Sequence, residues 1–161
     1  TQLILSDKNL SSEKLPIPML LCVGAVNSFL IKKKLRGYVS INVQSGEALD
    51  THSFATLIGV GATTVNPYLA FDSLFQRFEK KLFGQFSFDE CIERYIKSVN
   101  AGLLKIMSKM GISVLSSYRG GCNFETVGLS RTIVDDFFPG IISKISGIGL
   151  LGIEKKNKSN S

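Results

Sequence analysis

The stretch that decides the fold covers residues 88–129 and reads FDECIERYIKSVNAGLLKIMSKMGISVLSSYRGGCNFETVGL. Up to residue 110 its apolar side chains recur at steps of three and four residues, which places them along one side of a helix. Ser87 and Glu90 have the spacing of a capping box at the start of this helix. Gly111, which follows Lys109, indicates where the helix ends. The sequence therefore predicts a long amphipathic helix here.

The remainder of the stretch predicts a strand, a turn and a second helix. ISVLSSYRGG, residues 112–121, opens with β-branched and apolar residues and ends in two glycines, which is typical of a strand that runs into a turn. We expect a helix to follow the glycines and to continue to about residue 129. The order helix, strand, turn, helix indicates an α/β domain.

The flanking sequence continues this alternation. QLILS in the lead-in, residues 1–14, favours a short strand, and the glycine-rich and then polar end of the chain is expected to fray. Further helices are predicted over residues 19–36, 50–58, 69–83 and 130–138, and strands over residues 38–46 and up to Asn66. Alternation of this kind favours parallel strands with crossover helices. Because the strands are too few for a closed barrel, we expect a partial (β/α) barrel or a small open parallel sheet with flanking helices.

Composition excludes several classes of protein. A net charge of +6 without a basic stripe and interleaved aromatic residues argues against a nucleic-acid binder. The longest apolar run, residues 19–31, is too short to span a bilayer, and no signal peptide is recognisable. Cys22, Cys91 and Cys122 form no C-x-x-C pattern, so we expect free thiols and a cytoplasmic location. The first residue is threonine, which suggests a piece of a longer chain.

Polar residues follow three of the predicted strands, where ligands bind in parallel α/β sheets. These points are residues 44–47, residues 66–68 and residues 116–121. The third could bind an anion such as a phosphate, a flavin phosphate or a carboxylate, because glycine amides at a helix start attract negative charge and an arginine can clamp it. The candidate residues are Ser117, Arg119, Gly120 and Gly121. The alternative is a tight turn that needs glycine, with Arg119 paired to Glu125 or Glu47.

The sequence offers no recognisable catalytic set. Glu47 could be a general base, but capping of the helix that follows it is the favoured interpretation. His52 is the single histidine, and it is expected on a helix surface. No Ser–His–Asp arrangement, metal-ligand spacing, G-x-G-x-x-G motif or P-loop is present. We therefore predict no catalytic residue, no metal site and no bound cofactor in this chain.

Five segments together resemble a known family. They are LPIPMLLCVGAVNSFLI from residue 15, VQSGEA from residue 43, NPYLAF from residue 66, YIKSVNAGLLKIMSKMGIS from residue 95, and SYRGG-x-x-F-E-x-x-G-L from residue 117. In this order and spacing they resemble the second half of the central domain of the glutamate synthase large chain, over residues 15–150. On this basis residues 1–14 are a lead-in, and residues 151–161 are expected to form a polar, disordered tail.

The resemblance implies a scaffold and not a catalyst. In that family, an amidotransferase domain releases ammonia from glutamine, and a barrel with FMN and a 3Fe–4S cluster uses it to make glutamate from 2-oxoglutarate. The central domain connects these sites and is not credited with the chemistry. No residue here corresponds to the nucleophile, the cluster cysteines or the flavin contacts.

Some motif positions differ from the usual family pattern, and these departures favour a remnant of a split or decaying gene. The positions are Asn27, Ser28, Gln44, Ser53, Val60 and residues 121–123.

Three hypotheses follow. The first is an oxidoreductase fragment with a connecting role in glutamate biosynthesis and ammonia assimilation, inactive alone. The second is a phosphate- or flavin-binding module that uses residues 116–121. The third is an interaction piece that completes a split enzyme, with the other glutamate synthase domains as partners. In the third case, exposed core surface could also lead to self-association.

Overall fold

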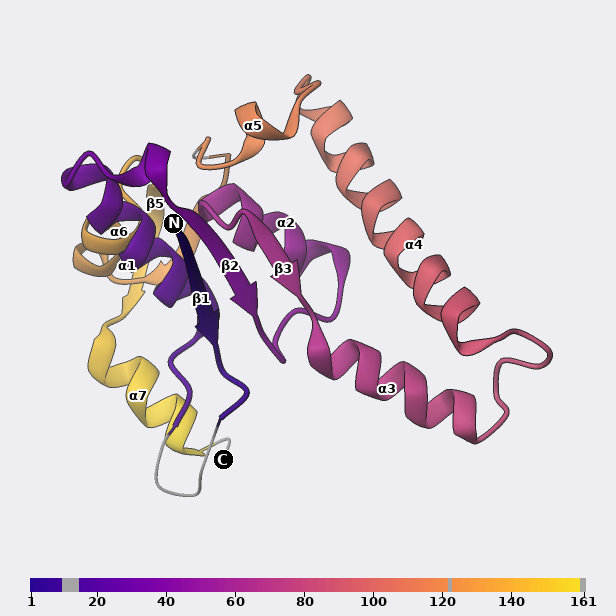
Figure 1. The fold of residues 1–161 in the computed structure, drawn as a ribbon. Coiled ribbons are helices and arrows are strands. Elements are labelled where there is room, and N and C mark those ends of the chain that lie inside the picture. Colours follow the sequence, from indigo (N-terminus) through magenta and orange to yellow (C-terminus); the bar gives the residue numbers. More distant parts are fainter. Residues whose placement is uncertain (10–14, 122, 160–161) are drawn as a thin grey trace.

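The computed structural model describes residues 1–9, 15–121 and 123–159, and over these residues the chain is mixed α/β (Figure 1). The predicted parallel strands with connecting helices are confirmed: one sheet has the order β1-β2-β3 and a second sheet contains β4 and β5. The described strands do not close into a barrel. The elements are β1 (Gln2–Ser6), α1 (Met19–Lys32), a 3-10 turn η1 (Arg36–Tyr38), β2 (Ser40–Gln44), α2 (Thr51–Val60), β3 (Thr64–Asn66), α3 (Tyr68–Glu79), α4 (Phe88–Lys109), α5 (Leu115–Tyr118), β4 (Glu125–Leu129), α6 (Arg131–Phe137), β5 (Ile142–Ile148) and α7 (Leu150–Ser159).

One face of the three-stranded sheet carries the core. Leu3 pairs with Ile41, and Val43 pairs with Leu5 on one side and Val65 on the other, so these side chains share a face. Ile41 and Val43 are fully buried and belong to a core cluster with residues of α1 and α2. Figure 1 shows the strands in front of these helices. Apolar residues at every second position of β2 therefore fix which face the helices cover.

The opposite face of the same sheet is mainly polar, with Ile4 as an exposed apolar exception. The Ser6 hydroxyl donates to Gln44 Oε1 at 2.8 Å, and the Thr64 hydroxyl donates to Asn42 Oδ1 at 2.7 Å. These side chains are directly paired across neighbouring strands. These hydrogen bonds pair polar side chains with one another across the strands, so this face is stable without an apolar layer packed on it.

Helices α3 and α4 form a hairpin that extends beyond the sheet, on the right of Figure 1. The predicted capping box is confirmed, because the Ser87 hydroxyl accepts from the Glu90 amide and the Glu90 carboxylate accepts from the Ser87 amide. Phe75 and Phe88 meet edge to face with ring centroids 5.4 Å apart, which holds the two helices together near their connection. The amphipathic pattern of residues 88–110 thus predicted α4 correctly.

Two predictions are wrong: the strand expected after α4, and the helix expected after the two glycines. Residues 115–118 form α5, and the segment after the turn is β4. The reason is Tyr118, whose side chain is fully buried and whose hydroxyl donates to the Ala55 carbonyl at 3.1 Å. Tyr118 fixes this segment across α2, and the Gly120 amide adds a hydrogen bond to the Gly59 carbonyl at 2.8 Å. A strand continuing along the first sheet is incompatible with these contacts.

The end of the chain also differs from expectation. Residues expected to fray form β5, and α7 covers most of the segment expected to be a disordered tail. The β5 signal is hidden because Ile142, Ile145 and Ile148 are spaced by three residues, while their partners Glu125, Val127 and Leu129 are spaced by two. Two register shifts reconcile these spacings, so the alternation typical of a strand is missing from the sequence.

Candidate functional site

Polar groups meet where β1, β2 and β3 end, at the carboxyl edge of the sheet. Asp7 follows β1, the loop Ser45–Gly46–Glu47 follows β2, and Tyr68 opens α3 just after β3. We call these five residues the strand-end cluster. Because parallel strands bring their carboxyl ends to one edge, this is the place where an α/β sheet usually offers a ligand site.

The Asp7 carboxylate is the centre of this cluster. It accepts a hydrogen bond from the Ser45 hydroxyl at 2.7 Å and from the Gly46 amide at 3.1 Å. Burial and the nearby Asp7 carboxylate raise the pKa of Tyr68. Both carboxylate oxygens of Asp7 therefore have partners within the protein.

Glu47 caps a helix, but not the one expected. Its Oε2 accepts from the Met19 amide at 3.0 Å, at the first residue of α1. The helix that follows Glu47 is capped by Asp50, which accepts from the Ser53 amide at 2.8 Å. Burial raises the pKa of Glu47, the Met19 amide opposes this, and the Asp7 charge raises it further.

These contacts give the strand-end cluster a structural role. It ties the end of β1 to the loop after β2, and Glu47 of that loop to the start of α1. Nearby Cys22 has its pKa raised by burial and by the charges of Glu47 and Asp7, which keeps the thiol protonated and a poor nucleophile. His52 is exposed on α2, as expected. Ser45 donates to the Asp7 carboxylate, but its side chain is completely buried, so its hydroxyl is not accessible to a substrate as a nucleophile.

Residues 116–121, predicted to form an anion-binding turn at the start of a helix, have a different local structure. No helix follows Gly120 and Gly121, because β4 is the next described element. The amides of Ser117, Arg119, Gly120 and Gly121 donate to the carbonyls of Val114, Leu115, Gly59 and Tyr118. Glu125 pairs with Lys144 and not with Arg119. An anion would have to displace these backbone hydrogen bonds, so the geometry favours the tight-turn interpretation and does not fit a flavin phosphate.

Asp7 is the member of the cluster that sequence reasoning missed. It was assigned to the lead-in, although it directly follows the strand signal QLILS and the rule for strand ends applies to it. Among the described residues, no group of histidine, cysteine or acidic side chains gathers to hold a metal ion. None of the described helices has the length and hydropathy to cross a bilayer.

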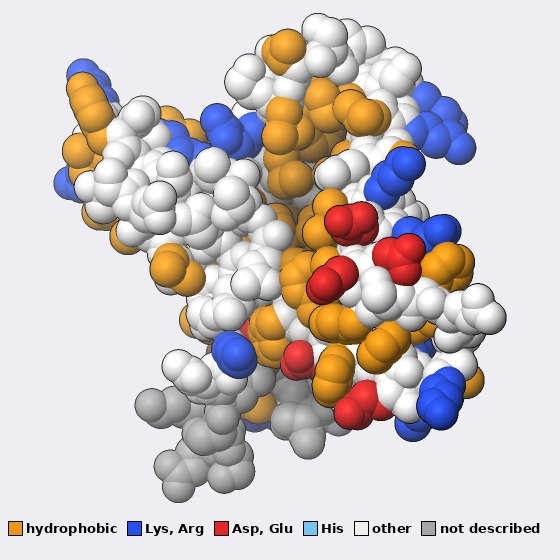
Figure 2. All heavy atoms as spheres, turned by 45° about the vertical axis from the view of Figure 1, so that its right-hand side comes forward, with side chains coloured by type: hydrophobic (Ala, Val, Ile, Leu, Met, Phe, Trp, Pro, Cys, Tyr) orange, Lys and Arg blue, Asp and Glu red, His pale blue; other side chains and the backbone are white. Residues whose placement is uncertain are grey.

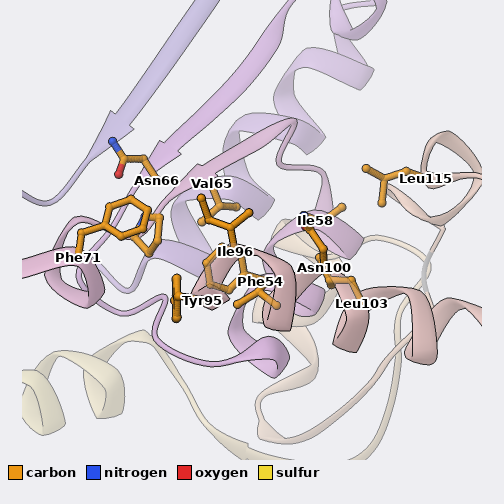
Figure 3. Close-up of a pocket in the computed structure, with 12 residues that line it drawn as sticks. Phe54, Ile58, Val65, Asn66, Phe71, Tyr95, Ile96, Asn100, Leu103 and Leu115 are labelled. Atoms are coloured by element: carbon orange, nitrogen blue, oxygen red, sulfur yellow. The ribbon is translucent and has the colours of Figure 1, made fainter. Parts of the chain in front are cut away.

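A second feature is an apolar groove between β3 and α4. It has a volume of about 430 Å³ and is lined by Phe54, Ile58, Val65, Asn66, Pro67, Phe71, Tyr95, Ile96, Val99, Asn100, Leu103 and Leu115. Figure 3 shows side chains of α2 and α4 converging on it, with Asn66 and Phe71 at one end and Leu115 at the other. In Figure 2, hydrophobic side chains gather in a hollow on this side of the molecule, with charged side chains beside it. Its size and lining are those of a binding groove.

Comparison with known proteins assigns the chain to a family. The model of the glutamate synthase central domain matches residues 1–130. The glutamate synthase (NADPH) large chain of Azospirillum brasilense is 53% identical over 156 residues, and that of Bacillus subtilis (strain 168) is 47% identical over 154 residues. These matches cover 97% and 96% of this chain but 10% of each relative. The ferredoxin-dependent glutamate synthase of Pyropia yezoensis is 44% identical over 165 residues, which cover 96% of this chain and 11% of the relative.

Proposed function

The chain belongs to the glutamate synthase central domain family, and from this premise we propose that it is the connecting scaffold of a glutamate synthase and does no chemistry alone. It spans about one tenth of the length of the relatives it matches. The observation that carries the proposal is the strand-end cluster, whose hydrogen bonds join chain segments to one another. A catalytic site would instead have reactive groups directed at a substrate.

The partners of this scaffold are the other parts of a glutamate synthase. Exposed apolar residues support this, because the surface of a self-sufficient domain rarely carries contiguous apolar patches. Val127, Ile142 and Ile145 of the β4–β5 sheet are each at least 60% exposed, and a parallel pair is normally covered on both faces. In this proposal FMN and the 3Fe–4S cluster lie in those other parts, this chain holds no cofactor, and the assembly is cytoplasmic.

In this proposal the chain contributes to glutamate biosynthesis by positioning the domains that carry out the reaction. The assembled oxidoreductase would convert glutamine and 2-oxoglutarate to two glutamates, and this chain would hold the ammonia-producing and ammonia-using domains in place. The phosphate- or flavin-binding alternative has no supporting observation, since the amides of its four candidate residues, Ser117, Arg119, Gly120 and Gly121, already donate to carbonyls.

A chimera tests the proposal. In the large chain of Azospirillum brasilense, the segment that aligns with this chain is replaced by this chain, and glutamine-dependent glutamate synthesis is measured. We expect the chimera to be active and the isolated chain to be inactive. Turnover by the isolated chain would refute the scaffold role. A chimera that folds but lacks activity would show that this chain cannot replace the family segment.

A further inference from the structure

Strand β3 has a partner on one side only. Within the described residues the sheet order is β1-β2-β3, so β2 occupies one edge of β3 and the other edge faces the groove. Val65, Asn66 and Pro67 form the groove wall on that side. An unpaired strand edge presents a row of backbone donors and acceptors that an extended segment can use.

The rest of the groove has the form of a place for one more strand. Phe54 and Ile58 of α2 line its floor, and Tyr95, Val99 and Leu103 of α4 line the wall opposite β3. In Figure 1, β3 and α4 stand apart on either side of this region, with α2 between them. In an α/β layer the next strand lies beside the edge strand and under a covering helix, which is the position of the groove.

The dimensions of the groove suit a short strand. Its α4 wall runs from Tyr95 to Leu103, and at the helical rise per residue this length is about 12 Å. An extended chain covers that distance in about four residues. Strand β3, with Thr64–Asn66, is of similar length.

The chemistry of the groove restricts what can enter it. The residues that line it include two asparagines and no charged side chain. A charged side chain buried there would lose its hydration without gaining a partner, so the side chains that face the groove must be uncharged and mainly apolar. About nine tenths of the length of the relatives lies outside the matched region and can supply such a segment.

We propose that an extended apolar segment from another part of the glutamate synthase large chain adds to the free edge of β3 and fills this groove. The inference rests on the proposed function, because the occupant is a piece of the same enzyme. Backbone hydrogen bonds to β3 supply the pairing, and alternate apolar side chains of the segment pack against α2 and α4.

Synthetic peptides test this directly. Overlapping peptides of about ten residues, roughly twice the length of a typical strand, cover the large chain of Azospirillum brasilense and are titrated against the purified chain. We expect one region to bind. Its binding should slow hydrogen exchange at the Val65 amide, because Asn66 bonds on the β2 side of the strand and successive residues direct their amides to opposite edges. A copy of that peptide with alternate backbone amides methylated cannot pair with a strand edge. It should bind at least about tenfold more weakly, which is a loss of about 1.4 kcal/mol in binding free energy.

A matched pair of α4 variants identifies the groove as the site. Ile96 lines the groove and is 44% exposed, whereas Leu104 is 64% exposed on the same helix and does not line it. Ile96→Asp should weaken peptide binding at least tenfold, and Leu104→Asp should leave it within twofold. Because both side chains are exposed, neither variant should unfold the chain.

Three outcomes would overturn the inference. If no peptide binds, or if Ile96→Asp and Leu104→Asp bind alike, the groove is not the receptor. If the methylated peptide binds as well as the unmodified one, the groove holds an apolar helix or side chain and not a strand. If the chain dimerises and Ile96→Asp makes it monomeric, the occupant is a second copy. An active chimera combined with any of these results would reject the strand but keep the scaffold role.

Discussion

Four of the residues at which the resemblance predicts departures from the family pattern each have a hydrogen-bond partner: Asn27, Ser28, Gln44 and Ser53. Asn27 accepts from Arg36 Nε at 2.6 Å, and the Ser28 hydroxyl donates to the Phe137 carbonyl at 3.1 Å. Gln44 accepts from Ser6, and the Ser53 hydroxyl donates to Asp50. Because satisfied polar groups cost little on burial, these departures are compatible with a stable fold. Whether the chain is a remnant of a split or decaying gene stays a prediction.

Arg36 is the clearest single residue to test. Its guanidinium donates to Asn27 Oδ1, to the Val39 carbonyl and to the Gly61 carbonyl, so it joins the end of α1 to the starts of β2 and β3. Lysine cannot reproduce this fork. Arg36→Lys should lower the free energy of unfolding by about 2 kcal/mol, measured by urea denaturation. Arg131→Lys, at an exposed position, is the control and should change it by less than about 0.5 kcal/mol.

Glu47 should make stability depend on pH. Its pKa is raised in the folded state, chiefly by burial, so the folded chain holds a proton there that the unfolded chain has lost. Stability from this residue is therefore highest below the ordinary glutamate pKa of about 4.3 and falls as pH rises through the raised pKa. Relative to Glu47→Gln, the wild type should lose stability as the pH rises above about 4.3, the ordinary glutamate pKa, as measured by urea unfolding at a series of pH values.

Glu90 provides the control of opposite sign. Hydrogen bonds from the Ser87 amide and hydroxyl lower its pKa, so its contribution should be gained and not lost as pH rises. Relative to Glu90→Gln, the wild type should therefore gain stability as the pH rises to about 5, just above the ordinary glutamate pKa, and should then stay level at higher pH. If Glu47 behaved as Glu90 does, the Met19 hydrogen bond and not burial would control its ionisation.

At the scale of elements, α4 is attached to the rest of the molecule where it crosses the start of α2. A Cβ added to Gly102 would lie 2.6 Å from Thr51 Cγ2, and the Tyr95 hydroxyl donates to the Leu49 carbonyl at 3.2 Å. The hairpin of α3 and α4 thus depends on a close contact that only glycine allows.

Gly102→Ala should have an effect whose sign depends on residue 51. Alanine normally stabilises a helix interior by about 0.5–1 kcal/mol relative to glycine. With Thr51 present the clash should outweigh this gain and lower the free energy of unfolding by about 1–2 kcal/mol. In a Thr51→Gly background the same substitution should be stabilising. Thermal unfolding of the four variants measures the effect, and equal effects in both backgrounds would contradict it.

The β4–β5 pair depends on a second close approach. A Cβ on Gly147 would lie 2.2 Å from the Gly128 carbonyl oxygen, which is backbone and cannot rotate away. Gly147→Ala should therefore lower the free energy of unfolding by at least about 2 kcal/mol. Gly149→Ala is the matched control, because its nearest neighbour is the Ser130 hydroxyl at 4.0 Å. Similar losses in urea denaturation for both variants would show that this sheet is not as closely paired as described.

At the scale of the whole molecule, apolar surface on β4 and β5 should cause self-association when the chain is isolated. Val127 and Ile145 are paired neighbours and are 66% and 61% exposed. We expect concentration-dependent association in sedimentation velocity, reduced in Ile145→Lys because a charge opposes burial. Ile4→Lys, at an exposed position of the other sheet, is the control and should associate as the wild type does. A monomeric wild type would argue against this surface as an interface.

The sequence by itself predicted those helices and strands whose pattern and end signals lie within or beside their own residues. The pattern of residues 88–110 and the Ser87–Glu90 cap predicted α4, and Pro67 marked the end of β3. The periodicity of a helix or a strand is set by which side chains share a face, so it can be read without knowing the partner. The family and the α/β class followed from the same short segments.

Tertiary structure alone decided the elements and sites that depend on distant partners. Tyr118 is buried against α2, which turns the expected strand into α5, and Ile142, Ile145 and Ile148 form a strand only through register shifts against β4. Glu47 caps α1, which begins 28 residues earlier in the chain, and the groove is lined by residues of α2, β3 and α4. These outcomes depend on contacts between residues far apart in sequence, and no local pattern specifies such contacts.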